Sequence, residues 1–193
     1  MVGSLCVWIS NVALMLQVSA SAELDRSQTP NASTVASAVA LTVIDEAGAT
    51  HSISPENFSQ LPQLSAKVTS HDADAKFARA SLVDLLQKSG VKFGKDLRGR
   101  RAATVAILEA TDGYRVAVAL LEIDPDTTDK VALVSDQRDG NPLGDKDGPY
   151  RLILPSEKRE VRWIRNLRTI RNINLRDFPL ESPRPNGADG GQK

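Results

Sequence analysis

Apolar and polar residues alternate over short stretches near the start of the chain, which is the pattern of half-buried β-strands. Residues 39–44 and 50–53 flank the turn-like segment Asp-Glu-Ala-Gly, so the sequence predicts a β-hairpin there. Ser54 followed by Pro55 is typical of a helix start, because serine caps free N–H groups and proline fits the first helical turn. We therefore expect a short helix that ends near Leu61.

A second helix is predicted directly after Ser81, which is placed to cap it. Leu82, Leu85 and Leu86 fall on one face at helical spacing, and Gly90 suits the end of the helix. We expect the stretch between Ser70 and Phe77, before this helix, to be a loop.

Five further runs are rich in aliphatic residues and bounded by turn residues, and they cover 64–69, 103–110, 114–120, 131–135 and 151–154. The segment Thr111-Asp112-Gly113 is the strongest hairpin signal in the chain. Many short strands with few short helices predict an α+β domain, mainly β, with mixed sheet and short helices.

The segment from Val161 to Leu175 fits neither simple period. Its apolar residues recur at every third position, whereas a helix requires 3.6 and a strand requires 2. We expect an irregular loop that passes into a bulged final strand.

The N-terminus resembles a secretory signal. An apolar run from Leu5 to Val18 precedes an A-x-A type cleavage sequence, so we expect a signal peptide over residues 1–22, cut after Ala22. A retained membrane anchor is the alternative, because the segment lacks a positive charge before the run. Cleavage would remove Cys6, the single cysteine.

The rest of the chain divides by composition. Residues 23–37 are polar and aperiodic and predict a linker, residues 38–178 predict one folded domain, and residues 179–193 are rich in proline and glycine and predict a disordered tail. Export would make the protein periplasmic or secreted, and no later segment is apolar enough to predict a membrane span.

Charge is unevenly distributed although the net charge is zero. From Tyr150 to Arg176 there are eight basic side chains against two acidic ones. A basic side of this kind suits an anionic small molecule or an acidic protein partner. The alternative is a face of solvated arginines.

Several chemistries find no support in the residues. The two histidines, His51 and His71, have no second ligand at metal-binding spacing, and no G-x-S-x-G elbow is present. Asp112 and Asp139 fit turns better than acid–base catalysis. Aromatic residues are scarce, so we expect no nucleic-acid partner.

Four blocks in order resemble the molybdopterin-binding domain of the sulfite oxidase type, an oxidoreductase superfamily. They are Phe77 to Leu86, like F-T-G-V-P-L-x-D-L-L; Ile107 to Val118, around D-G-Y; Asp139 to Leu143 with Gly148 to Pro155, like N-G-x-P-L…G-x-P-x-R-L-x-x-P; and Val161 to Ile164, like V-K-W-[IV]. The resemblance spans about residues 39–175 and implies the fold of that family.

The resemblance also suggests site residues. The family's enzymes hold molybdenum through the pterin and one cysteine thiolate, which would fall near Ser70, where this chain has no thiol. Ser70 is the nearest small polar replacement and is therefore a candidate cofactor-binding residue. Arg162 matches a basic position that in the family lies against the cofactor phosphate, and Lys158 and Arg159 are neighbours able to join it.

These observations favour an exported, non-catalytic, molybdopterin-binding-like domain that binds an anionic ligand or a periplasmic protein partner. We expect no bound metal or cofactor and no catalytic residue. The alternatives are a molybdopterin-dependent oxidoreductase with atypical metal ligation and a purely structural interaction module.

Overall fold

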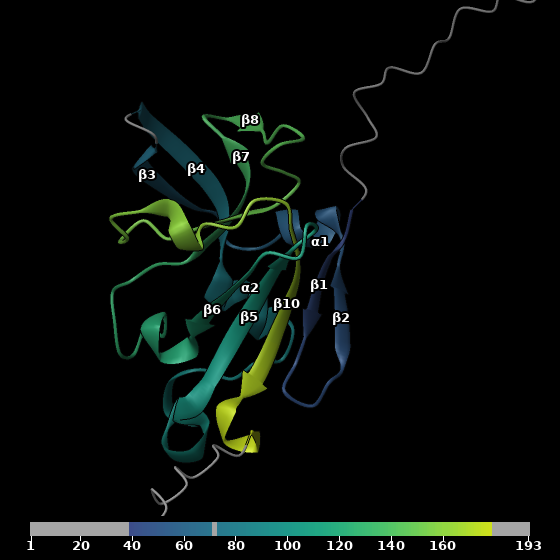
Figure 1. The fold of residues 1–193 in the computed structure, drawn as a ribbon, viewed down its shortest axis with the longest axis vertical. Coiled ribbons are helices and arrows are strands. Elements are labelled where there is room, and N and C mark those ends of the chain that lie inside the picture. The colour runs from purple at the N-terminus through teal and green to yellow at the C-terminus, as the bar shows by residue number, and fades with distance from the viewer. Residues whose placement is uncertain (1–38, 71–72, 179–193) are drawn as a thin grey trace, which may run out of the picture. The chain divides into compact units, whose positions relative to one another are not determined.

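The computed structural model describes residues 39–70 and 73–178 (Figure 1). The predicted signal peptide, linker and C-terminal tail lie outside the described residues, as do His71 and Asp72. The described ranges contain two sheets and short helices, so the predicted class, an α+β fold that is mainly β, is confirmed.

Sheet A has five strands, β1 (Leu41–Ile44), β2 (Thr50–Ile53), β5 (Thr104–Ala110), β6 (Arg115–Ala119) and β10 (Leu167–Asn174). Their order in the sheet is β2-β1-β10-β5-β6. Both predicted hairpins are confirmed, β1 with β2 and β5 with β6. Strand β10 joins the two hairpins, because it pairs parallel with β1 and antiparallel with β5 (Figure 1).

Sheet B is built from β3 (Leu64–Ser70), β4 (Ala73–Ser81), β7 (Leu133–Arg138), β8 (Asn141–Pro142) and β9 (Arg151–Ile153). The order β3-β4-β7-β8 runs through the sheet, and β9 also pairs with β7. A β-bulge between Ala78 and Arg79 interrupts the pairing of β4 with β7. The hydroxyl of Ser135 fills this bulge, with its oxygen 3.2 Å from the Ala78 nitrogen and 2.6 Å from the Ala78 oxygen.

Strand β4 corrects the predicted loop between Ser70 and Phe77. The alternation is present, since Ala75 and Phe77 are buried while Asp74 and Lys76 are exposed. Alanine is small and contributes little to a hydrophobic pattern, so the segment looks polar in the sequence. Pairing with β3 makes residues 73–76 part of a strand, and from Phe77 onward β4 also pairs with β7.

Both predicted helices are confirmed and both begin at the expected caps. Helix α1 (Pro55–Ser59) follows Ser54, whose side chain accepts a hydrogen bond from the Asn57 N–H. Helix α2 (Leu82–Lys88) follows Ser81, whose side chain accepts from the Asp84 N–H. The short 3-10 helices are η2 (Gly94–Leu97), η3 (Gly99–Ala103), η4 (Leu120–Glu122), η5 (Glu160–Arg162) and η6 (Leu175–Asp177).

The segment from Val161 to Leu175 follows the sequence prediction. An irregular segment with η5 leads into β10, and the register of β10 against β5 shifts between Leu167 and Thr169. The period-three pattern therefore reflects two different structures placed in succession.

One hydrophobic core connects the two sheets and both helices. Its fully buried members include Leu41, Leu108 and Ile170 from sheet A, Phe77 and Leu133 from sheet B, Phe58 from α1 and Leu85 from α2. Aromatic edges contribute, because the Phe58 and Tyr150 ring centroids lie 4.8 Å apart. Within residues 39–70 and 73–178, no helix has the length and apolar character needed to cross a membrane.

Candidate functional site

Three of the four predicted site residues lie on the loop that connects β9 to β10. Lys158 and Arg159 are exposed and precede η5, and Arg162 is its last residue. Ser70 is on another element, since it ends β3 and pairs with Ala73 of β4. The structure therefore groups the three basic residues and leaves Ser70 on sheet B.

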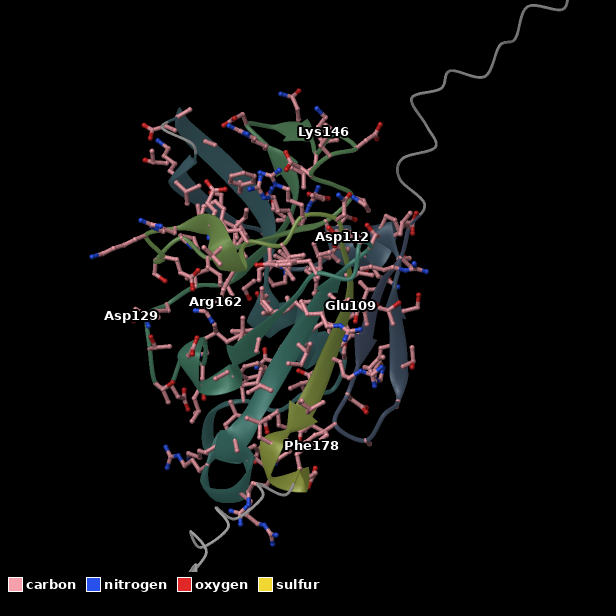
Figure 2. All side chains as sticks on the ribbon, in the orientation of Figure 1. Glu109, Asp112, Asp129, Lys146, Arg162 and Phe178 are labelled. Carbon is pink, nitrogen blue, oxygen red and sulfur yellow. The ribbon has the colours of Figure 1, made fainter. Side chains whose placement is uncertain are left out.

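Arg162, labelled in Figure 2, is held by two acidic residues, Glu122 of η4 and Glu157 of the loop before η5. Its Nε donates to the Glu157 carboxylate at 2.7 Å, and Nη1 lies 3.3 Å from the Glu122 carboxylate. Nη1 also donates to the Ala117 carbonyl of β6 at 3.1 Å. Partial burial opposes the charged form, but the hydrogen bond with Glu157 and the two negative charges raise the pKa of Arg162.

The space beside Arg162 is small. A cavity of about 80 Å³ is lined by the carboxylates of Glu122 and Glu157 and by the cations Lys130 and Arg162, together with apolar residues such as Leu154. Ligand pockets normally measure at least about 300 Å³, so this space is too small to enclose a pterin. This arrangement does not fit a pterin phosphate, and the predicted cofactor contact of Arg162 stays a prediction.

The exposed part of the loop has a different character. Among the described residues, Lys158 and Arg159 form no ion pair with a carboxylate. Val161 is 67% exposed, and its carbonyl accepts a 2.7 Å hydrogen bond from the Tyr114 hydroxyl. Tyr114 is itself 47% exposed, so two exposed cations are followed within three residues by an exposed apolar side chain whose backbone contacts an exposed tyrosine. We call Tyr114, Lys158, Arg159 and Val161 the basic–apolar surface.

The turn of the β5–β6 hairpin supports this surface. Asp112 accepts a hydrogen bond from the Tyr114 N–H at 2.9 Å, as expected for a turn residue (Figure 2). The Thr111 N–H donates to the Asn166 carbonyl at 3.1 Å, which ties the hairpin to the loop. Gly113 adopts a φ of 86°, a value that favours glycine in this turn.

Arg151 is a buried cation that the sequence analysis did not single out. It is 2% exposed, and its guanidinium lies 5.3 Å from the Phe77 ring centroid and 5.8 Å from that of Trp163. It pairs with Asp147 at 3.2 Å and with Glu160 at 3.0 Å. Burial lowers the pKa of Arg151, and the charge of Asp147 opposes this effect. The sequence signal was an arginine inside an otherwise apolar strand.

The remaining ionisable groups of the sequence analysis have structural partners. His51 lies 3.2 Å from the Asp45 carboxylate, and this hydrogen bond is the main cause of the lowered pKa of Asp45. Asp139 accepts from the Lys76 N–H at 2.8 Å across the sheet, in keeping with a turn role. Over residues 39–70 and 73–178, no group of three His, Cys, Asp or Glu side chains is placed to hold a metal ion.

The chain matches no protein-family model, and no curated protein matches it. The resemblance to the molybdopterin-binding domain therefore stays a prediction that rests on the four sequence blocks. The resemblance of its fold to that of sulfite oxidase is likewise a prediction, whereas the α+β class is observed.

Proposed function

We propose that this protein is an exported, non-catalytic binding domain whose basic–apolar surface recognises an acidic protein partner. The observation that carries the proposal is the contrast within one loop. Arg162 is neutralised by Glu122 and Glu157, whereas Lys158 and Arg159 are exposed beside Val161 and form no ion pair with a described carboxylate.

The geometry favours a protein over a small anion. Lys158 and Arg159 are exposed on the loop before η5, close in sequence to exposed Val161, and they do not line the small cavity at Arg162. Tyrosine and arginine are enriched in the centres of protein interfaces, and charged groups at the rim steer an oppositely charged partner. Within this proposal, the hydrogen bonds of Arg162 fix the loop and its exposed neighbours make the contact.

Charge reversal tests this surface, with polyglutamate as the acidic probe and fluorescence anisotropy as the readout. We expect Lys158→Glu with Arg159→Glu to weaken binding at least about tenfold, because two attractive contacts become repulsive. The matched control is Lys92→Glu with Lys95→Glu, which changes the net charge equally at two other exposed lysines. We expect this control to weaken binding less than about twofold.

Two outcomes would overturn the proposal. Equal losses in both double variants would mean that the net charge of the protein, and not this surface, attracts the probe. If Tyr114→Ala bound polyglutamate as tightly as the wild type, Tyr114 would not be part of the contact.

A separate measurement tests whether the protein contains a molybdopterin cofactor. We expect neither molybdenum nor pterin in the protein purified from its native host, measured by elemental mass spectrometry and by pterin fluorescence. Stoichiometric molybdenum with pterin would instead establish the alternative of an oxidoreductase with atypical ligation.

A further inference from the structure

A cavity of about 300 Å³ lies on sheet B, apart from the basic–apolar surface. Strands β4 and β7 supply Arg79, Asp136 and Gln137, and the segment before β9 supplies Tyr150. The remaining wall is largely apolar and comes from Val39, Pro55, Pro142, Leu143 and Pro149. This is the lower end of the size range of small-molecule pockets, which suits a small metabolite.

The β-bulge brings a cation and an anion together at this cavity. The bulge lies next to Arg79, and such irregularities redirect side chains away from the regular alternation. Arg79 Nε donates to one carboxylate oxygen of Asp136 at 2.8 Å. The side chains of Arg79 and Asp136 are 23% and 26% exposed, so both reach the cavity from a half-buried position.

Both charged groups keep unused hydrogen-bonding capacity. Neither Nη atom of Arg79 has a hydrogen-bond partner among the described residues, and Asp136 Oδ2 accepts no hydrogen bond from them. A guanidinium with free Nη groups matches a carboxylate, and a carboxylate with a free oxygen matches an ammonium group. The pair therefore presents complementary positions for both ends of a zwitterion.

Tyr150 adds a polar group that the fold does not use. It is 3% exposed and lines the cavity, and its hydroxyl forms no hydrogen bond with any residue of the described ranges. Burial, followed by the negative charges of Asp136 and Glu56, raises the pKa of Tyr150 to about 12. The hydroxyl consequently stays protonated at neutral pH and is able to donate to a ligand oxygen.

We infer that this cavity binds a small zwitterion, an α-amino acid with an apolar side chain. The carboxylate of the ligand contacts Arg79 and Tyr150, its ammonium group contacts Asp136, and its side chain packs on the proline and leucine wall. Like charges on a ligand would face either Arg79 or Asp136 unfavourably, which disfavours dianions and dications. The inference uses none of the residues of the basic–apolar surface and does not depend on the proposed function.

Calorimetric titration of the purified protein with L-leucine tests the site. We expect leucine to bind, and we expect N-acetyl-leucine, which lacks the ammonium group, and leucine amide, which lacks the carboxylate, to bind at least about tenfold more weakly. A thermal-shift screen of the other apolar amino acids then identifies the preferred side chain.

Three variants assign the contacts. Asp136→Asn should weaken leucine but not N-acetyl-leucine, and Arg79→Gln should weaken leucine but not leucine amide. Tyr150→Phe should weaken leucine binding several-fold without lowering the melting temperature, because the Tyr150 hydroxyl has no hydrogen-bond partner among the described residues. Arg101→Gln is the matched control, since Arg101 forms a comparable half-exposed pair with Glu46 outside the cavity.

The inference is overturned if no apolar amino acid raises the melting temperature or gives heat of binding. It is equally overturned if N-acetyl-leucine binds as tightly as leucine, because the ammonium contact with Asp136 would then be absent. A loss of leucine binding in Arg101→Gln as large as in Arg79→Gln would show that the effect is not local.

Discussion

Two tyrosine–arginine pairs lie near the loop between β9 and β10, one buried and the other partly exposed. Tyr150 and Arg151 are 3% and 2% exposed, whereas Tyr114 is 47% exposed and the Arg162 side chain is 38% exposed. Each arginine forms ion pairs with two carboxylates. The residue types and the ion pairs are alike, and the surroundings differ.

This comparison shows that burial, more than the number of partners, determines what an ion pair contributes. The buried Arg151 guanidinium lies against the rings of Phe77 and Trp163, so its removal would leave both a cavity and unbalanced charge. Water screens Arg162 and can replace its partners, so its contribution to the free energy of unfolding is small. The buried pair is structural, and the exposed pair positions a surface.

The largest expected effect comes from Arg151→Ala, which should lower the free energy of unfolding by about 3 kcal/mol, because it removes a buried cation and leaves a cavity. Denaturant unfolding of the purified protein measures this change. Arg151→Met keeps most of the volume and should lose less than half as much. A loss below about 1 kcal/mol in Arg151→Ala would contradict the structural role of the buried pair.

A smaller effect is expected from alkaline pH through Tyr150. Its pKa is about 12 in the folded protein against 10.0 ordinarily, so above pH 10 the unfolded chain loses this proton first. The contribution of Tyr150 to the free energy of unfolding is fully present below pH 10. As the pH rises to about 12, the free energy of unfolding falls by ~2 kcal/mol. Unfolding curves of the wild type and Tyr150→Phe across this range measure it. Parallel pH profiles for the two proteins would show that Tyr150 is not the group responsible.

The smallest effect is expected from Arg162→Ala, at most about 1 kcal/mol, because exposed ion pairs are weak and screened by salt. Unfolding at low and at high salt measures it, and the loss should shrink as salt is added. Arg115→Ala, which removes a more exposed pair with Glu109, is the control and should lose less still. If Arg162→Ala lowered the free energy of unfolding as much as Arg151→Ala, burial would not explain the difference between the two ion pairs.

Local sequence signals predicted much of the fold. Ser54 and Ser81 cap the two helices, and Asp112 with Gly113 turns the β5–β6 hairpin, because each of these features depends on neighbours within a few residues. Strand β4 was missed, since its alanines give little pattern and its pairing with β7 joins residues about 57 positions apart, as Ala78 and Ser135 show.

The candidate sites depended on such distant contacts and were harder to predict. The composition of the chain was enough to locate the basic loop. It could not show that Arg162 is paired while its neighbours are exposed, because one partner of Arg162 is Glu122, which lies 40 positions away. The cavity on sheet B needs Arg79 and Asp136, 57 positions apart, and no local motif connects them. Arg151 looked like one more member of the basic stretch until its burial was known.

The position of β10 in sheet A has a consequence for the order in which the chain acquires its structure. This strand, the last among the described residues, lies between β1 and β5, so it bridges two hairpins whose nearest ends, Ile53 and Thr104, are about 50 positions apart. Isolated two-stranded hairpins are marginally stable in water. During synthesis, sheet A is therefore expected to remain two separate halves until nearly the whole domain has left the ribosome.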